Sequence, residues 1–261
     1  MDHIKDLKIV ITAGASGIGS EVAIALSKAG AKVMICDIDE NLLENFSNKN
    51  PQISTYHADV SNESEIKSFF KEIKNKFNNI DVLINNAGIS GASGKLEDID
   101  FNEWKETLNV NLDGVFLATR SAIPLLKNNG GSIINIGSTS SFLGNPLRSA
   151  YSATKWGLIG LTKTWAMEYG ENNIRVNAVC PSSVNGERIE NVIKKEAKYR
   201  NTSTEKIRSA YLKQTSLETF IDVEEVIGML VYLISPLAKK ITGQMLVIDG
   251  NTESLSIKGI D

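Results

Sequence analysis

The sequence predicts an α/β protein with a doubly wound parallel sheet, and three observations lead to this fold class. Short apolar runs rich in β-branched residues alternate with helical segments from one end of the chain to the other. Most of these runs are continuous rather than alternating, as expected when helices cover both faces of a parallel sheet. A glycine-rich turn at residues 14–19 follows the first run, which is typical of a βα unit that binds nucleotides.

Seven segments have the composition of strands, and turn or helix signals bound each of them. The predicted strands are residues 8–12, 32–37, 52–58, 82–86, 132–136, 175–179 and 244–249. Together they predict a Rossmann-type fold, in which helices flank both faces of a seven-stranded parallel sheet.

The helices between these strands carry their own start and stop signals. Gly30 ends the first helix, because glycine tolerates the left-handed geometry that follows a helix. Ser61 or Asn62 can cap the third helix, whose apolar residues follow at helical spacing: Ile66, Phe69, Phe70 and Ile73. No repeat, low-complexity tract or Pro/Gly/Ser-rich linker interrupts the pattern, so residues 1–261 are predicted to form a single domain.

Composition limits the classes of function. The 261 residues suffice for one large domain, and the net charge of −3 gives no reason to expect a nucleic-acid partner. No run reaches the ~18 to 20 apolar residues of a membrane span, and the first six residues lack the apolar stretch of a signal peptide. Cys36 and Cys180 are expected to be buried free thiols. We therefore expect a cytoplasmic protein with no membrane partner.

Residues 186–215 break the alternation and are predicted to form two helices, a lid over the strand ends where open α/β sheets bind ligands. The second helix starts with a capping box, Thr202-Ser203-Thr204-Glu205. The segment contains eight Lys or Arg residues against four Glu, in contrast to the acidic whole. These cations either form the solvated face of an amphipathic lid or, with Arg188 as the leading candidate, contact an anionic substrate.

The glycine-rich turn fits the phosphates of a dinucleotide. Gly17 and Gly19 lack the Cβ atoms that would keep phosphate oxygens from the backbone amides at a helix N-terminus. The spacing is G-x-x-G-x-G rather than G-x-G-x-x-G, and a tight turn without a ligand is the alternative.

Asp37 ends the second predicted strand, about 20 residues beyond the turn, where an acid can bind ribose hydroxyls. The same carboxylate would repel a 2′-phosphate, and no Lys or Arg lies in the turn or directly after Asp37. NAD is therefore favoured over NADP. The alternative is that Asp37 is a capping or solvated carboxylate.

Tyr151 and Lys155 are four residues apart, which places both side chains on one face of a helix. A phenol normally loses its proton near pH ~10 and is a poor base at neutral pH. A fixed ammonium favours the phenolate and brings the phenol closer to the working range of a general acid or base. Alone, the pair could be a surface contact. With the glycine-rich turn and Ser138 upstream, it predicts hydride transfer.

These residues make the chain resemble the short-chain dehydrogenase/reductase family over nearly its whole length. The resemblance rests on ordered motifs: Thr12-Ala13-Gly14-Ala15-Ser16-Gly17-Ile18-Gly19, Asp59-Val60, Asn85-Asn86-Ala87-Gly88, Asn109-Val110-Asn111-Leu112, Ser138, Tyr151-Ser152-Ala153-Thr154-Lys155 and Asn177-Ala178-Val179-Cys180-Pro181. It implies an NAD site formed by Gly14, Ser16, Gly17, Ile18, Gly19, Asp37, Ile38, Asp59, Val60, Asn86, Ala87, Gly88, Tyr151, Lys155, Pro181 and Val184. No metal is expected.

The resemblance also implies a catalytic set. Tyr151 would exchange a proton with the substrate oxygen while hydride moves to or from the nicotinamide. Lys155 would lower the tyrosine pKa and bind the nicotinamide ribose, and Ser138 would donate a hydrogen bond to the substrate oxygen. Asn111 would hold a water that connects Lys155 to solvent. A helix-capping Ser138 and a structural Asn111 are the alternatives.

The chain departs from the family pattern at a few positions. Ala13 stands where the family usually has its first glycine, so the turn is expected to be rearranged locally. Gly186 stands where the family has a threonine, which removes one side-chain hydroxyl contact. The backbone of Val184 is still expected to meet the nicotinamide carboxamide.

The polar residues around the predicted catalytic set favour a small polar alcohol or ketone substrate. The candidate substrate residues are Ser138, Ser140, Asn145, Arg148 and Arg188. The leading function is NAD-dependent interconversion of a secondary alcohol and a ketone on a sugar, polyol or hydroxy acid. The alternatives are a 3-oxoacyl-thioester reductase, which would usually prefer NADPH, and a non-catalytic sensor of NAD(H).

The resemblance implies a homotetramer. Its contacts would come from two long helices, about 101–127 and 151–169, and from the final strand, and the tail 251–261 could reach a neighbouring subunit. Trp156, beside Lys155, is expected to pack against a helix or a second subunit.

Overall fold

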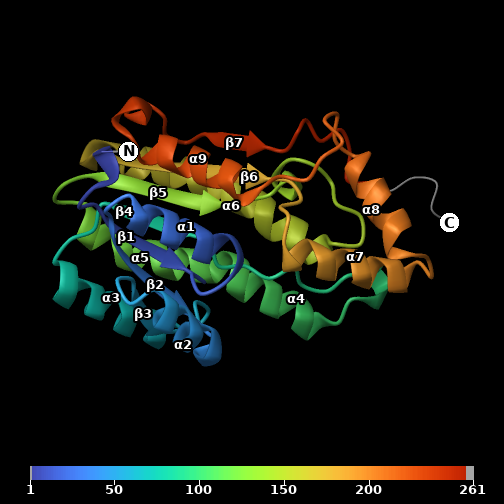
Figure 1. Cartoon of the computed structure of the whole chain (residues 1–261), viewed down its shortest axis with the longest axis horizontal. Coiled ribbons are helices and arrows are strands. Elements are labelled where there is room, and N and C mark those ends of the chain that lie inside the picture. Colours follow the sequence, from blue (N-terminus) through green and yellow to red (C-terminus); the bar gives the residue numbers. More distant parts are fainter. Residues whose placement is uncertain (1, 257–261) are drawn as a thin grey trace.

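The computed structural model describes residues 2–256 and contains one sheet of seven parallel strands (Figure 1). The strand order is β3-β2-β1-β4-β5-β6-β7. The strands are β1 (Lys8–Thr12), β2 (Lys32–Asp37), β3 (Ser54–His57), β4 (Val82–Asn85), β5 (Gly131–Ile136), β6 (Ile174–Pro181) and β7 (Met245–Ile248). The predicted fold class is confirmed, although β3 is shorter and β6 longer than the composition predicted.

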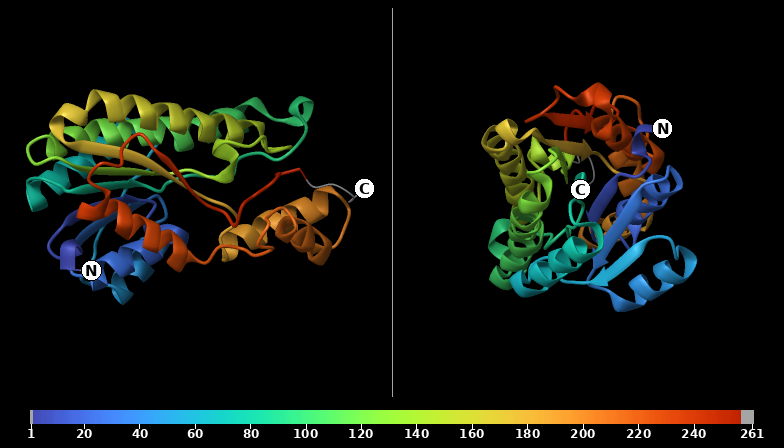
Figure 2. Two further views of the ribbon diagram at one scale, coloured as in Figure 1. Left: turned by 90° about the horizontal axis from the view of Figure 1, so that it is seen from above. Right: turned by 90° about the vertical axis from the view of Figure 1, so that its left-hand side faces the viewer.

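Helices cover both faces of the sheet (Figure 2). One layer contains α3 (Glu63–Phe77), α4 (Phe101–Leu108), α5 (Gly114–Leu126) and α6 (Ser149–Glu168). The other contains α1 (Gly17–Lys28), α2 (Glu40–Lys49) and α9 (Val223–Ile234). Val10 of β1 packs into the first core, whereas its neighbours Ile9 and Ile11 pack into the second. The central strand β1 is therefore apolar on both faces, which explains its continuous apolar run.

A buried amide network joins the centre of the sheet to the first helical layer. Asn85 Nδ2 donates to Thr119 Oγ1 of α5 (3.0 Å) and to Asn135 Oδ1 of β5 (2.8 Å). Asn135 Nδ2 in turn donates to Thr162 Oγ1 of α6 (2.9 Å). Because buried polar groups cost free energy unless they are paired, this network fixes one arrangement of α5 and α6 on the sheet.

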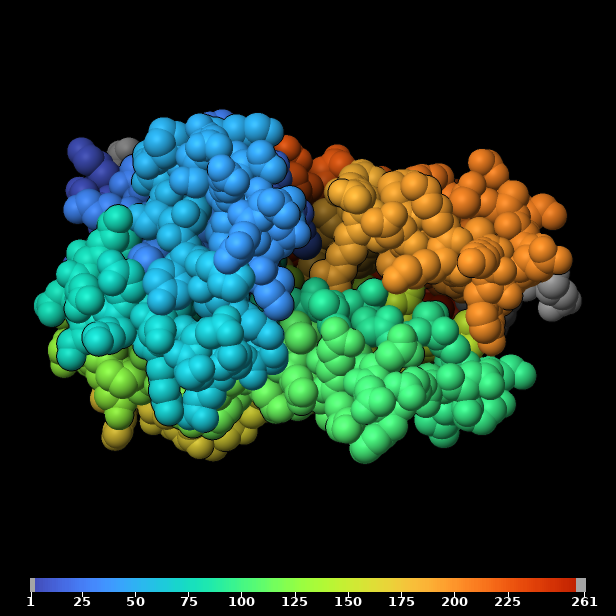
Figure 3. Space-filling view, turned by 90° about the horizontal axis from the view of Figure 1, so that it is seen from below, coloured from blue at the N-terminus to red at the C-terminus, as the bar shows by residue number. Residues whose placement is uncertain are grey.

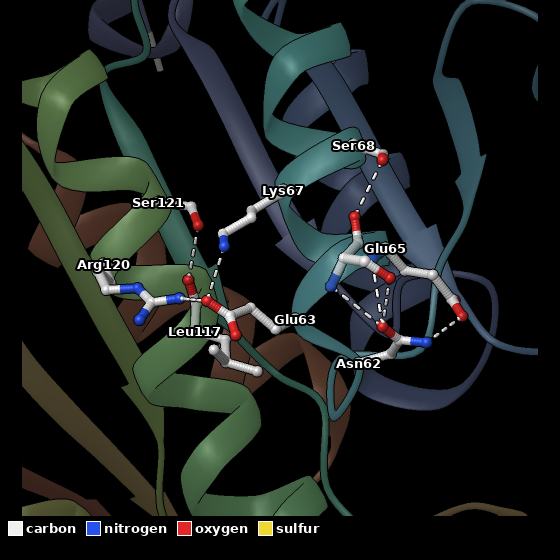
Figure 4. Close-up of polar contacts among 9 residues, drawn as sticks. Asn62, Glu63, Glu65, Lys67, Ser68, Leu117, Arg120 and Ser121 are labelled. Atoms are coloured by element: carbon white, nitrogen blue, oxygen red, sulfur yellow. Dashed lines mark hydrogen bonds and ion pairs between the residues drawn. The ribbon is translucent and has the colours of Figure 1, made fainter.

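The N-terminus of α3 is capped and linked to α5 (Figure 4). Asn62, rather than Ser61, is the cap, and its Oδ1 accepts hydrogen bonds from the two amides that follow Glu63 (3.0 and 3.4 Å). Glu63 pairs with Lys67 (2.8 Å) and with Arg120 of α5 (2.6 Å), and hydrogen bonds from these two cations lower the pKa of its carboxyl. All three side chains are exposed, so the pairs orient the helices more than they stabilise them.

The helix that starts with α4 contains a short π-helical segment at Asn109–Asp113 before it continues as α5. The sequence predicted one helix over about 101–127 and missed this segment, because its residue types do not distinguish a π turn from an α turn. Single π turns are frequent at functional sites, and this one carries Asn111.

The predicted pair of helices in residues 186–215 is present as α7 (Glu187–Tyr199) and α8 (Thr204–Leu212). Figure 1 shows them beyond the carboxyl ends of the strands. Ser203 caps α8 and accepts a hydrogen bond from the Lys206 amide (3.3 Å). The two helices share a small core of their own, formed by Ile189, Ile193, Ala197, Ile207 and Phe220.

The described start of the C-terminal tail packs against its own chain. Thr252 forms an isolated antiparallel bridge with Thr215, and the Glu253 amide donates to the Gln214 carbonyl (2.9 Å). The expected contact of the tail with a neighbouring subunit falls partly on residues 257–261, which lie outside the described residues. Over residues 2–256, no helix has both the length and the apolar composition that a bilayer crossing requires.

Candidate active site

The predicted site residues gather at the carboxyl edge of the sheet. β1 and β4 are neighbours although β2 and β3 lie between them in the sequence, so the strand order reverses there and opens a crevice. The segments that follow β1, β2, β4, β5 and β6 carry the predicted cofactor and catalytic residues. In Figure 3 a hollow separates the blue N-terminal surface from the orange surface of α7 and α8.

Close packing explains the glycines of the turn after β1. A Cβ atom on Gly14 would lie 2.6 Å from the Ile35 side chain, and one on Gly19 would overlap the Ala13 carbonyl oxygen. Gly17 has a φ of +54°, in the left-handed region that disfavours a side chain. The turn therefore presents the amides at the start of α1 to the crevice without side chains in the way.

Ala13 keeps a backbone conformation that suits glycine. Its φ is +50°, so the departure from the family pattern adds backbone strain at this position. Asn86 fixes the turn from β4, because its Nδ2 donates to the carbonyl oxygens of Thr12 (3.1 Å) and Ala13 (2.8 Å). Ser16 is the exposed N-cap of α1 and its hydroxyl makes no capping bond, which leaves it available to a phosphate.

The acids at the ends of β2 and β3 are fixed by backbone amides. Asp37 is buried, with Oδ2 accepting from the Ala15 amide (3.1 Å) and Oδ1 from the Asp39 amide (3.3 Å). The carboxylate thus lies against the glycine-rich turn, and the Ile38 side chain beside it is exposed. Asp59 Oδ1 accepts from both the amide and the hydroxyl of Ser61, at 2.8 Å each. The next residue, Val60, is buried against Gly114.

Tyr151 and Lys155 lie on the inner face of α6, as their spacing predicts. The Lys155 Nζ lies 5.6 Å from the centre of the Tyr151 ring and donates to the Ile136 carbonyl at the end of β5 (2.7 Å). That carbonyl was not among the predicted site groups. It holds the ammonium beside the phenol, and a backbone acceptor of this kind has no signal in the sequence.

Electrostatics at Tyr151 favour the phenolate. Burial raises the pKa of Tyr151, but the positive charge of Lys155 lowers it, as do Arg188, Ser138 and Arg148, and the net effect is a lowered pKa. Burial also lowers the pKa of the Lys155 ammonium, with the phenolate opposing that effect and Arg188 adding to it. The tyrosine is thus poised to exchange a proton closer to neutral pH than a free phenol.

Ser138 combines the predicted catalytic position with the alternative capping role. Its Oγ accepts from the Ser140 amide (3.2 Å) while the Ser141 hydroxyl accepts from the Ser138 amide (3.2 Å), which makes a capping box on the short 3₁₀ helix Thr139–Ser141. Ser140 itself is buried, and its hydroxyl accepts from Asn145 Nδ2 (2.9 Å). Ser140 and Asn145 therefore support the loop that carries Ser138.

Asn111 is bound within the protein through its whole amide. Its Oδ1 accepts from the Ile89 amide (2.7 Å), and its Nδ2 donates to the Ile89 carbonyl (2.9 Å) and to Thr154 Oγ1 (3.3 Å). A Cβ atom added to Gly88 would lie 3.3 Å from Asn111 Oδ1 and 3.8 Å from Lys155 Nζ, so these three residues meet. Asn111 holds the loop after β4 in place beside Lys155.

The segment after Pro181 leaves the backbone of Val184 free. The Ile221 amide donates to the Ser183 carbonyl (2.9 Å), and the Asn185 amide donates to the Ile221 carbonyl (2.8 Å). In this parallel bridge the amide and carbonyl of Val184 point the other way, and neither has a hydrogen-bond partner within residues 2–256. Both groups are therefore available to a ligand, and the contact with a carboxamide stays a prediction.

The two candidate substrate arginines approach the same loop. Arg148 is buried at the start of α6 and donates to the Ser90 carbonyl (3.4 Å). Arg188 of α7 donates to the Gly88 carbonyl (3.2 Å). The loop that both arginines contact lies beside Lys155, because a Cβ atom on Gly88 would be 3.8 Å from Lys155 Nζ, and the positive charges of both arginines lower the pKa of Tyr151.

Comparisons with known proteins show the family to which the chain belongs. A family model described as enoyl-(acyl carrier protein) reductase matches residues 12–251. The chain is 35% identical over 246 residues to a 3-oxoacyl-[acyl-carrier-protein] reductase of Thermotoga maritima, covering 92% of this chain and 95% of the relative. It is also 35% identical over 249 residues to a D-beta-hydroxybutyrate dehydrogenase of Rhizobium meliloti (92% and 96%). A trans-4-hydroxycyclohexanecarboxylate dehydrogenase of Sinomonas cyclohexanicum is 34% identical over 259 residues (95% and 93%).

Solved structures give the same result. NAD⁺-bound xylitol dehydrogenase superposes with a TM-score of 0.91 at 25% identity, covering 95% of this chain and 99% of that one. A variant of actinorhodin polyketide ketoreductase with NADPH gives 0.90 at 29% identity (96% and 98%). The chain therefore belongs to the short-chain dehydrogenase/reductase family of oxidoreductases, which act on CH–OH groups.

Proposed function

We propose that the protein interconverts a secondary alcohol and a ketone on a small polar substrate, with NAD as the hydride carrier. The observation that carries this proposal is the position of the Lys155 ammonium, which the Ile136 carbonyl holds 5.6 Å from the centre of the Tyr151 ring. Burial raises the pKa of Tyr151, but the charge of Lys155 lowers it, and Arg188, Ser138 and Arg148 add to that effect. A phenol that is poised in this way next to a substrate hydroxyl acts as a general base in oxidation and as a general acid in reduction.

The residues at the crevice fit a dinucleotide. The glycine-rich turn supplies unobstructed amides for the phosphates, and Val184 offers an unpaired amide and carbonyl for a carboxamide. Asp37 lies against the turn, where its carboxylate would bind the adenosine ribose. When bound, the nicotinamide would accept or donate the hydride.

The chain's own residues would control the proton and the substrate oxygen. Tyr151 would take the proton of the substrate hydroxyl in oxidation and return it in reduction. Ser138 would donate a hydrogen bond to the same oxygen as its charge changes. Lys155 would keep the pKa of the Tyr151 phenol low and would pass the proton on toward solvent. Asn111 lies beside this route, and its side-chain amide holds the loop after β4.

The charge of Asp37 supports NAD over NADP. A 2′-phosphate beside the turn would meet the Asp37 carboxylate, and no Lys or Arg lies in the turn or directly after Asp37 in the sequence. The similar solved structures include one with NAD⁺ and one with NADPH, so they do not decide between the two cofactors.

Reduction of a 3-oxoacyl thioester is the second candidate function. The resemblance to the Thermotoga maritima reductase supports it. Asp37 argues against this function, because its carboxylate would repel the 2′-phosphate of NADPH, the cofactor that such reductases usually prefer. A non-catalytic NAD(H) sensor is the third, and the presence of Ser138, Tyr151 and Lys155 in one site argues against it.

We also propose a cytoplasmic homotetramer. Trp156 and Met167 of α6 are exposed in the single chain (53% and 85%), and so is Phe116 of α5 (43%), a helix of the same layer, which suits helix packing between subunits. Light scattering on the purified protein would give the subunit number directly.

The decisive experiment is a cofactor titration followed by a substrate screen. NAD and NADP are titrated first, and polyols, sugars, hydroxy acids and 3-oxoacyl thioesters are then screened by the absorbance of the reduced nicotinamide. NAD-linked turnover that disappears in Tyr151→Phe supports the proposal. Tight NAD binding with no turnover across the screen would favour the sensor, and NADPH-linked turnover of the thioesters would favour the second candidate.

A further inference from the structure

Two of the six arginines differ from the other four, each of which has a carboxylate partner or donates to two carbonyls. Arg120, Arg200 and Arg208 each pair with a glutamate, and Arg175 donates to two backbone carbonyls. Within the described residues, Arg148 and Arg188 form no ion pair, and each donates to a single carbonyl. Both exceptions lie at the crevice.

Arg148 is the more unusual of the two, because its side chain is buried. Its residue is only 8% exposed, and its one hydrogen bond, to the Ser90 carbonyl, is long at 3.4 Å. Buried charges in proteins are ordinarily paired, since an unpaired guanidinium loses its hydration without compensation. Arg148 therefore lacks a negatively charged partner in the part of the chain that the structure describes, and an anionic ligand would provide one.

The carboxylate of Glu196 in α7 already has two partners. Glu196 Oε1 pairs with Arg200 Nε (2.9 Å), and its Oε2 accepts from the Tyr211 hydroxyl (2.7 Å). Glu196 thus pairs with Arg200 and Glu190 with Arg208, and over residues 2–256 neither glutamate pairs with Arg148 or Arg188.

Arg188 and Arg148 converge although they are 40 positions apart in the chain. They contact the carbonyls of Gly88 and Ser90, two residues apart on the loop after β4. This loop lies beside the catalytic pair, since a Cβ atom on Gly88 would be 3.8 Å from Lys155 Nζ, which is itself 5.6 Å from the centre of the Tyr151 ring. Guanidinium groups bind carboxylates through paired, charge-assisted hydrogen bonds.

We propose that Arg148 and Arg188 form one anion site beside Tyr151, which binds the carboxylate of a small hydroxy acid or oxo acid substrate. This inference rests on the proposed oxidoreductase function and narrows its substrate class. The acid would lie with its carboxylate between the two arginines and its carbinol at Tyr151 and Ser138. A sugar or polyol would leave both guanidinium groups without a counter-ion.

Binding to a dead-end complex tests the site without requiring turnover. The protein saturated with NADH is titrated with 2-hydroxybutyrate, 3-hydroxybutyrate, 4-hydroxybutyrate and 4-hydroxycyclohexanecarboxylate, each against its neutral amide. Because the reduced cofactor cannot accept hydride from an alcohol, only binding is measured. We expect at least one acid to bind about tenfold or more tightly than its amide, the effect of one or two charge-assisted hydrogen bonds.

Variants assign that preference to the arginines. Arg188→Gln and Arg148→Gln should each remove most of the acid-over-amide preference, and Arg148→Lys should retain part of it. Lys195→Gln is the matched control, because it removes one exposed charge from the same helix as Arg188 and should leave the ratio unchanged. Should Arg148→Gln fail to fold, the exposed Arg188 still provides the test.

Two outcomes would overturn the proposal: no acid binding more tightly than its amide, or a preference that survives in both arginine variants. A loss of NADH affinity in Arg188→Gln with an unchanged acid preference would also overturn it, because the arginine would then serve the cofactor. Failure of the oxidoreductase function looks different, since the acid preference would persist while no acid or amide is turned over with NAD or NADP.

Discussion

Asp37→Asn tests the choice of cofactor, because it removes a charge at the end of β2 and keeps the size of the side chain. Both carboxylate oxygens accept backbone amides, from Ala15 (3.1 Å) and Asp39 (3.3 Å). Asparagine keeps one acceptor and turns an NH₂ group toward the other amide. We expect the free energy of unfolding to fall by about 1–3 kcal/mol, the cost of a buried donor without a partner.

The charge, rather than the shape, should decide between NAD and NADP. A carboxylate and a phosphate charge about 5 Å apart repel by roughly 3 kcal/mol at an effective dielectric constant near 20. A charge-assisted hydrogen bond to a ribose hydroxyl is worth about 1 kcal/mol more than a neutral one. In Asp37→Asn, NADP should therefore bind about 100-fold more tightly and NAD about fivefold more weakly.

The assay is the dissociation constant of each reduced cofactor, measured by nicotinamide fluorescence at constant ionic strength. Asp39→Asn is the control, because Asp39 caps α2 from an exposed position and its loss should change the NAD/NADP ratio less than about threefold. A ratio in Asp37→Asn within threefold of the wild type, or a wild-type preference for NADP, would refute the reasoning.

Three further predictions address the turn, the π-helical segment and the phenol. Ala13→Gly should stabilise the protein by about 0.5–1 kcal/mol and raise Tm by roughly 1–3 °C, because glycine relieves the positive φ; a lower Tm in calorimetry would contradict this. Asn111→Ala should lower the free energy of unfolding in urea by about 2–4 kcal/mol and should also lower kcat. The control Asn109→Ala, at an exposed position, should change neither quantity. Equal effects of the two substitutions would contradict the role given to Asn111. Arg188→Gln removes a positive charge that lowers the pKa of Tyr151, so the rise of kcat/KM with pH for oxidation of a neutral alcohol should move to higher pH; an unmoved profile, matching Lys195→Gln, would count against that contribution.

Local sequence signals were sufficient for the sheet and for the spacing of the catalytic pair. Continuous apolar runs gave β1 and β2 with their observed bounds, and the interval between Tyr151 and Lys155 placed both on one face of α6. Asn62 and Ser203 cap their helices as short polar side chains at such positions do.

Contacts between distant segments could not be predicted. The carbonyl of Ile136 that holds Lys155 and the bridge between Val184 and Ile221 both depend on how strands and loops meet in space. The convergence of Arg148 and Arg188 on one loop has the same origin. Residue type identifies an arginine as a candidate ligand for an anion, but it does not show whether a carboxylate of the protein already pairs with that arginine.

The separate core beneath α7 and α8 has a consequence for how the protein opens. Its buried residues pack on one another rather than on the sheet, and isolated bridges at Val184 and Thr215 join the segment to the rest. Such a unit can detach while keeping its internal contacts, so its amides should exchange with solvent at a lower opening free energy than those of β1 or β4. The side of the site formed by α7, with Arg188, would therefore move more readily than the side formed by α6, with Tyr151.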